Sequence, residues 1–204
     1  MTDVNIMALY GSPRQGGNTE KLLDEFLKGA VSEGAAVDRL TIHDATIFPC
    51  RGCLACFQKG RCIIVDDMEQ IYSRLLAADI VALASPVYFY GVTGGAKILI
   101  DRAQALWGRK YVLNDPALGK EGKKRAGFFI SVGGTKGPKM FEGAVLTVKY
   151  FFDAFNANYA GELLVRQVDG KGEILQQPQA LADARAAGRT LVKEFSPFLR
   201  HSLA

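Results

Sequence analysis

The sequence has 204 residues, of which 49% are hydrophobic and 23% charged, and these proportions exclude a globally disordered chain. A chain of this length buries a sufficient core without disulfides, so we expect one domain over residues 1–204. The apolar runs are too short to span a bilayer and the first residues do not resemble a signal peptide, so we expect a cytoplasmic protein without membrane contact. Much of the net charge of +4 lies at residues 120–125, without interleaved aromatic residues, which argues against a nucleic-acid partner.

Short apolar runs alternate along the chain with segments of helical periodicity. The predicted strands are residues 4–10, 36–42, 80–84, 126–132 and 160–165, and the predicted helices are residues 22–30, 68–77, 96–106, 140–155 and 179–195. The second strand contains Asp38, Arg39 and Thr41 and has the character of an edge strand, whereas the first, third and fourth are apolar nearly throughout. We therefore expect an α/β fold: a three-layer sandwich whose five-stranded parallel sheet has the order 2-1-3-4-5, with helices on both faces.

A loop rich in glycine and polar residues joins the first predicted strand to the first helix. It spans residues 11–19, GSPRQGGNT, and its glycines let backbone amides and the helix N-terminus face a common anion. The candidate phosphate-binding residues are Ser12, Arg14, Gln15, Gly16, Asn18 and Thr19. Gly17 and Asn18 replace the Lys and Ser or Thr of a Walker A loop, and Pro13 breaks the GxGxxG pattern, so we expect a phosphate monoester. The alternative is an ordinary strand-to-helix turn.

These residues resemble the phosphate loop of NAD(P)H-dependent FMN reductase-like flavoproteins, which have the flavodoxin-like fold. Two further segments agree: SPVYFYG at residues 85–91, followed by Lys97 and Asp101-Arg102 on the next predicted helix, and Gly133-Gly134-Thr135 after the fourth strand. The resemblance covers most of residues 4–135. It implies bound FMN, a flavin-dependent oxidoreductase activity and NAD(P)H as a possible electron donor.

The loops after the third and fourth strands suit the flat ring of a flavin. The first loop offers Pro86, Val87, Tyr88, Phe89, Tyr90 and Gly91, and the second offers Gly133, Gly134 and Thr135. Aromatic side chains can stack on the ring, and backbone amides next to glycines can approach its polar edge. Packing in the core is the competing interpretation for the aromatic residues, especially Phe89, and Tyr88 is the preferred ring contact.

All four cysteines fall within thirteen residues after the second predicted strand, in the segment PCRGCLACFQKGRC. They are Cys50, Cys53, Cys56 and Cys62. Three cysteines at successive intervals of three, with a fourth after a glycine-containing turn, favour the ligands of an iron-sulfur cluster. Reduced thiols without a metal are the main alternative, ahead of a zinc site and of disulfides.

The cysteine motif resembles that of the iron-sulfur flavoproteins, the branch of the same family in which such a loop carries a 4Fe-4S cluster. Asp66-Asp67-Met68 agrees with this branch, although the two acids by themselves are explained by the dipole of the helix that they precede. The resemblance implies a homodimer or homotetramer that brings one subunit's cluster close to another subunit's FMN.

The predicted function is electron transfer between ferredoxin or NAD(P)H and a small-molecule acceptor, through FMN and the cluster. No catalytic side chain is expected, because the flavin and the cluster carry the chemistry. One alternative is a cluster-free NAD(P)H-dependent FMN, quinone, nitro- or azo-compound reductase. Another is a non-catalytic phosphate-binding or thiol redox-sensing module. Lys136 and Lys139 are candidates for contact with a nicotinamide cofactor's phosphate, and Trp107 is interpreted as a packing or interface residue.

Overall fold

Five strands form one sheet in the structure, a computed structural model that describes residues 4–201 and the side chains of residues 4–195. The strands are β1 (Asn5–Tyr10), β2 (Ala36–Thr41), β3 (Ile80–Ala84), β4 (Arg125–Gly133) and β5 (Ala157–Arg166). Each pair of neighbouring strands is parallel, and their order across the sheet is β2-β1-β3-β4-β5. The predicted fold class, sheet order and edge position of the second strand are confirmed.

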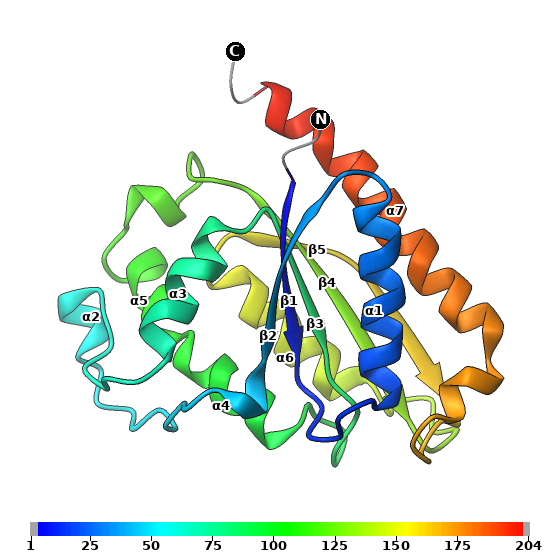
Figure 1. Cartoon of the computed structure of the whole chain (residues 1–204). Coiled ribbons are helices and arrows are strands. Elements are labelled where there is room, and N and C mark those ends of the chain that lie inside the picture. The colour runs from blue at the N-terminus through cyan, green and yellow to red at the C-terminus, as the bar shows by residue number, and fades with distance from the viewer. Residues whose placement is uncertain (1–3, 202–204) are drawn as a thin grey trace.

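Helices cover both faces of this sheet (Figure 1). One face carries α1 (Asn18–Val31) and α7 (Pro178–His201), and the other carries α3 (Met68–Ala77), α4 (Gly94–Arg102), α5 (Gln104–Tyr111) and α6 (Glu142–Asp153). Because successive strand residues point to opposite faces, Ile6 and Ala8 pack in the core beneath α1, and Met7 and Leu9 pack in the core beneath α3 and α4. β3 and β4 are buried along their whole length, whereas β2 is partly exposed.

The predicted helix at residues 96–106 is divided into α4 and α5. The amide of Leu106 donates to the carbonyl of Ala103 at 2.9 Å rather than to the carbonyl of Arg102. The Arg102 carbonyl instead accepts from the Tyr72 hydroxyl at 2.6 Å. A side chain from α3 therefore takes the acceptor that a continuous helix would use, and this long-range contact has no signature in the local periodicity.

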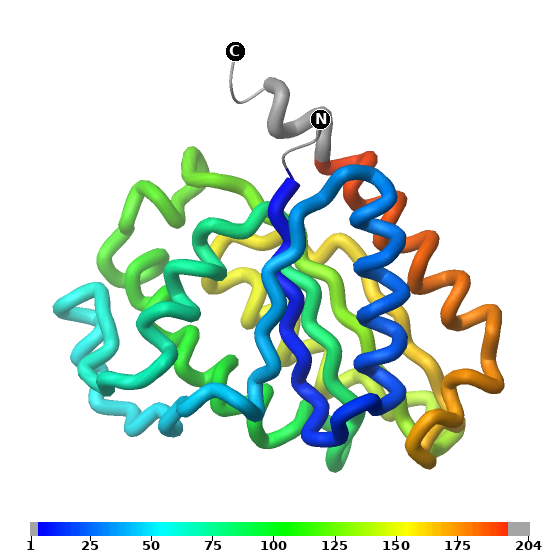
Figure 2. The backbone as a smooth tube through the Cα atoms, viewed as in Figure 1, coloured from blue at the N-terminus to red at the C-terminus, as the bar shows by residue number. Residues whose placement is uncertain are grey.

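Two glycines allow α1 and α7 to run side by side, as the tube drawing shows (Figure 2). A Cβ atom on Gly29 would lie 1.9 Å from the Arg185 carbonyl oxygen, and one on Gly188 would lie 1.9 Å from the Phe26 carbonyl oxygen. Only glycine permits this approach of the two backbones. Arg185 also forms a 2.5 Å ion pair with Glu25, which ties the two helices together at the surface.

The carboxyl ends of the strands lie at one edge of the sheet, at the bottom of Figure 1. The short helix η1 (Ile42–Asp44) leads from β2 into the cysteine segment, which contains the unpredicted one-turn helix α2 (Cys56–Lys59). The other short helices are η2 (Pro116–Leu118) and η3 (Glu173–Gln176). Over the part of the chain that the structure describes, no helix is both long enough and apolar enough to cross a membrane.

Candidate functional site

Four loops meet around a small hollow at the carboxyl edge of the sheet. Its volume is about 50 Å³, and its walls are Ser12, Arg14, Asn18, Thr19, Pro86, Val87, Tyr88, Val132, Gly133, Gly134, Val168, Asp169 and Lys171. The structure thus brings together residues from all three loops singled out in the sequence. Six candidates lie outside this lining: Gln15, Gly16, Phe89, Tyr90, Gly91 and Thr135.

The loop between β1 and α1 is held closely against its neighbours. The Gly11 amide donates to the Ala84 carbonyl at 2.7 Å, and the Thr93 hydroxyl donates to the Gly11 carbonyl at 2.6 Å. No side chain in the described part of the protein caps α1, so the first amides of this helix are open to an external acceptor. The Gly16 amide, however, already donates to the Glu20 carboxylate at 2.7 Å. The first turn of α1 is therefore the better candidate for the phosphate.

Two predicted phosphate donors instead fasten a fourth loop to the first. The Asn18 side chain accepts from the amide of Gly172 at 2.9 Å and donates to the carbonyl of Gly170 at 2.8 Å. The Arg14 guanidinium donates to the carbonyl of Asp169 at 2.7 Å. This loop, residues 167–174, was missed in the sequence analysis. Its signal was the segment VDGKG after the fifth strand, because that strand ends at the same edge as the others.

Buried hydroxyl groups fix the loop after β3. The Ser131 hydroxyl donates to the carbonyl of Ser85 at 2.7 Å, and the Ser85 hydroxyl accepts from the amide of Thr93 at 3.0 Å. These three polar side chains are almost completely buried. They set the position at which Pro86, Val87 and Tyr88 leave the sheet for the hollow.

The aromatic residues of this loop form a strained, exposed hairpin. Tyr88 and Gly91 exchange two backbone hydrogen bonds of 3.0 Å, and between them Phe89 and Tyr90 have φ values of 48° and 63°. Left-handed backbone at two successive residues with Cβ atoms costs about 1 kcal/mol or more each. Phe89 is fully exposed and Tyr90 is 57% exposed, so packing in the core does not explain either residue.

The four cysteines line a second, separate hollow of about 30 Å³. All four are free; Cys50 and Cys53 are exposed, and Cys56 and Cys62 are partly buried. Burial raises the pKa of the Cys56 thiol, and the nearby thiols raise it further. Over the described residues, however, no three or more His, Cys, Asp or Glu side chains are close enough together to hold a metal ion. Four thiols around one hollow match the donor chemistry of a cluster, although no three of them are spaced to hold a single metal ion.

Helix α5 packs against the cysteine segment. A Cβ atom on Gly108 would lie 2.8 Å from the Phe57 ring, so this glycine lets α2 sit directly on α5. Trp107 packs against Phe57 and against Tyr111, with ring centroids 5.6 and 5.3 Å apart. Trp107 therefore has a packing role in this chain, which is one of the two roles predicted from the sequence.

Asp66 and Asp67 do more than begin α3. Asp66 forms a buried ion pair with Arg102 at 2.5 Å, and Asp67 accepts from the amide of Thr46 at 2.7 Å. Burial alone would raise the pKa of Asp66, but the Arg102 guanidinium and two backbone amides bring it below its usual value. The helix dipole was thus an incomplete explanation. Among the described residues, Lys97 and Asp101 form an ion pair only with each other, at 2.6 Å on the surface.

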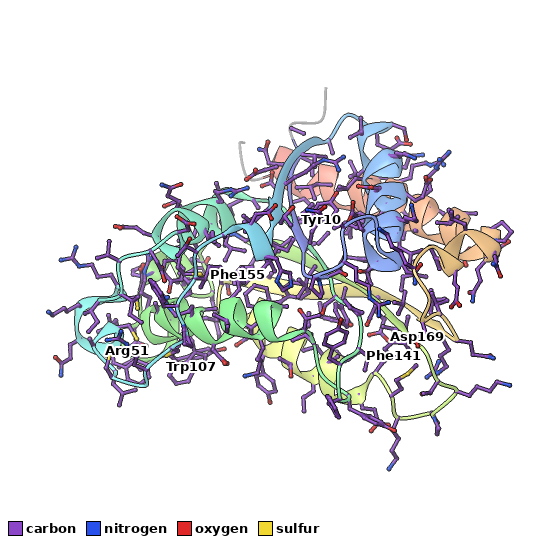
Figure 3. The ribbon with its side chains drawn as sticks, turned by 60° about the horizontal axis from the view of Figure 1, so that its bottom comes forward. Tyr10, Arg51, Trp107, Phe141, Phe155 and Asp169 are labelled. Atoms are coloured by element: carbon purple, nitrogen blue, oxygen red, sulfur yellow. The ribbon has the colours of Figure 1, made fainter. Side chains whose placement is uncertain are left out.

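The two hollows lie at opposite ends of the carboxyl edge. Figure 3 places Arg51 of the cysteine segment and Trp107 at one end and Asp169 of the first hollow at the other. Lys136 and Lys139 are exposed on the loop between β4 and α6, outside both hollows.

A model of the family described as NADPH-dependent FMN reductase matches residues 4–161 of this chain. An iron-sulfur flavoprotein of Methanocaldococcus jannaschii is 38% identical over 103 residues, which are 50% of this chain and 53% of that protein. A second iron-sulfur flavoprotein of that organism is 33% identical over 73% of this chain and 71% of its own length. The match to the first of these relatives thus spans about half of its length.

Solved structures show the same fold at low sequence identity. The NAD(P)H:quinone oxidoreductase from Methanothermobacter marburgensis superposes with a TM-score of 0.66 and 15% identity, over 93% of this chain and 95% of its own. At this level the similarity supports the fold alone. It agrees with the sheet order and the helix layers described above.

Proposed function

The chain belongs to the NADPH-dependent FMN reductase family, and from this premise we propose that it is an FMN-dependent oxidoreductase of the iron-sulfur flavoprotein kind. In the proposed function, electrons pass between ferredoxin or NAD(P)H and a small-molecule acceptor, through FMN and a 4Fe-4S cluster. The observation that carries the flavin part is the meeting of the loops after β1, β3 and β4 around one hollow. The cluster part is supported by four cysteines around a second hollow.

The residues of the first hollow suit FMN in a specific way. The open first turn of α1, with Ser12 and Thr19, would hold the phosphate, and Arg14 and Lys171 would supply positive charge beside it. Tyr88 would cover the ring, while the backbone at Gly133 and Gly134 would face its polar edge. FMN supplies reversible transfer of one or two electrons when bound. Lys136 and Lys139 remain our candidates for the phosphate of NAD(P)H.

Cys50, Cys53, Cys56 and Cys62 would hold the cluster, which exchanges single electrons when bound. Because the two hollows are separated in one chain, transfer between them is better served across a contact between two subunits. Four apolar side chains of the cysteine segment, Phe48, Leu54, Ile63 and Val65, are more than half exposed and suit such a contact. We propose a homodimer or homotetramer, acting in the cytoplasm where free thiols stay reduced.

The test is anaerobic purification followed by an absorption spectrum and assays of flavin, iron and acid-labile sulfide. We expect about one FMN per chain, with iron and sulfide equal and near four. Cys53→Ser should lose iron and keep FMN, and Ser12→Ala should weaken FMN binding and keep iron. Iron that is unchanged in Cys53→Ser would contradict the ligand assignment.

A cluster-free NAD(P)H-dependent reductase of FMN, quinones, nitro or azo compounds is the second candidate. It is favoured by the observation that the described thiols are not close enough together to hold a metal ion. Full flavin without sulfide after anaerobic reconstitution, together with rapid NAD(P)H oxidation, would select this function. Stoichiometric FMN in either case would exclude a redox-sensing module that has no bound flavin.

A further inference from the structure

The ion pair between Arg102 and Asp66 is unlike the others in the described part of the chain. Its two pairs of atoms, Nη1 with Oδ2 and Nη2 with Oδ1, are 2.5 and 3.0 Å apart, and each side chain is only 1% exposed. In each of the other ion pairs of this part, at least one side chain is more than a quarter exposed. Removing two charged side chains from water carries a large desolvation cost. The presence of a fully buried ion pair at this position therefore indicates a specific role for it.

This pair holds both ends of the cysteine segment at one point. Before the cysteines, Arg102 Nη1 donates to the carbonyl of Phe48 at 2.7 Å, and the amide of Phe48 donates to Asp66 Oδ2 at 2.9 Å. After the cysteines, Arg102 Nη2 donates to the carbonyl of Ile64 at 3.5 Å, and Asp66 itself begins the turn into α3. Residues 49–63 therefore form a loop whose two ends are fastened to the last turn of α4.

Arg102, which lines the cysteine hollow, also has an unused hydrogen-bond donor. Its Nε is buried and has no hydrogen-bond partner among the described residues, although the rest of the guanidinium is fully engaged. Arg102 is one of the residues that line the hollow of the four cysteines. A buried N–H without an acceptor is unfavourable, and thiolate sulfurs at a metal group are anionic acceptors.

We propose that Arg102 is a positioning residue for the cysteine segment. With Asp66 it fixes the two ends of the loop, and through Nε it donates a hydrogen bond to a sulfur of the thiolate-bound metal group. The inference rests on the cluster assigned under the proposed function. Hydrogen bonds and positive charge near cluster sulfurs favour the reduced form, so Arg102 raises the reduction potential of the cluster.

The test compares Arg102→Lys and Asp66→Asn with the unmodified protein, all reconstituted anaerobically. Lysine keeps the charge of Arg102 but lacks the forked geometry that engages two loop ends at once. Arg74→Lys is the matched control, because Arg74 forms a two-point pair with Asp38, both contacts 2.7 Å, away from the cysteine segment. Flavin content and thermal unfolding show whether each variant is folded. If Arg102→Lys does not fold, the same measurements are made on Asp66→Asn, which also disrupts the ion pair.

We expect Arg102→Lys to lose iron to a chelator at least tenfold faster than the unmodified protein, with a lower midpoint potential in an EPR-monitored titration. FMN content and the Arg74→Lys control should be unchanged. A potential equal to that of the unmodified protein would overturn the hydrogen-bond role, and equal rates of iron loss would overturn the positioning role.

A second readout needs no cluster. In the protein without iron, amide hydrogen exchange across residues 49–63 should rise at least tenfold in Arg102→Lys, while α1 keeps its protection. Unchanged exchange there would also overturn the positioning role. If the unmodified protein takes up no more iron and sulfide than Cys53→Ser, the proposed cluster function and the Nε role fail together. The exchange measurement still decides whether Arg102 holds the loop.

Discussion

Asn18 and Gly172 are 154 residues apart in the chain, yet the side-chain oxygen of Asn18 accepts from the amide of Gly172 at 2.9 Å. The same oxygen accepts from the amide of Ile174 at 3.3 Å, and the side-chain nitrogen donates to Gly170. One carboxamide at the start of α1 thus builds the wall of the first hollow that follows β5. The hollow depends on a contact that joins the first loop of the sheet to the last.

Replacing Asn18 with Ala should therefore weaken FMN binding without a direct loss of a phosphate ligand. Three hydrogen bonds to the loop at residues 167–174 disappear, and each is worth about 1 kcal/mol. We expect the Kd for FMN to rise by about tenfold or more in a fluorescence titration. Asn158→Ala, at an exposed position in β5 far from the carboxyl edge, is the control. An unchanged Kd would show that the loop keeps its place without Asn18.

The hairpin at Phe89 and Tyr90 should store strain that a better turn sequence releases. Asn-Gly is the preferred dipeptide for two successive left-handed residues, so Phe89→Asn combined with Tyr90→Gly should stabilise the FMN-free protein by about 1 to 2 kcal/mol. Urea unfolding measures the change. If either ring also covers the flavin, the same variant should bind FMN more weakly. A loss of stability in the FMN-free protein would mean that the rings make compensating contacts.

Adding a single methyl group at Gly188 should push α1 and α7 apart. Helix propensity alone predicts that Gly188→Ala is stabilising by up to about 1 kcal/mol. The added Cβ would lie 1.9 Å from the Phe26 carbonyl oxygen, so we expect a net destabilisation of about 1 to 3 kcal/mol in urea unfolding. Ala186→Ser, at an exposed position on the same helix, should change stability much less. The sign of the effect decides between local propensity and helix packing.

Glu25 should make the stability of the protein depend on pH. Its hydrogen bonds with Lys28 and then Arg185 lower the pKa of Glu25 below its ordinary value of 4.5. A carboxyl whose pKa is lower in the folded state contributes stability above pH 4.5, and this contribution is lost as the pH falls through the folded pKa. Glu25→Gln should cost about 0.5 to 1 kcal/mol at pH 7.

The two proteins should approach equal stability as the pH falls through the lowered pKa of Glu25, because the carboxyl of the folded, unmodified protein then becomes protonated. Urea unfolding at pH 7, 5 and about 3.5 checks this convergence. A difference that does not narrow at all across this pH range would assign the effect of the substitution to packing rather than to the charge of Glu25.

The layer structure of this protein was readable from local patterns. Runs of buried residues at β1, β3 and β4, and the polar residues of β2, identify central and edge strands, because burial on both faces demands apolar side chains throughout. The glycine-rich loop and the cysteine spacing were visible in the sequence for a different reason. Both are short motifs whose chemistry lies within a few neighbouring residues.

Only the tertiary structure decided how those motifs are held. Three contacts show this: the hydrogen bonds between Asn18 and the loop after β5, the ion pair of Arg102 with Asp66, and the hydrogen bond from Tyr72 to Arg102 where α4 ends. Each contact joins residues that lie 30 or more positions apart in the chain. Periodicity and spacing describe neighbours in sequence and contain no information about such partners. The side chain of Asn18 could be identified as a hydrogen-bonding group from the sequence, but the acceptors and donors around it exist only once β5 has been placed at the far edge of the sheet.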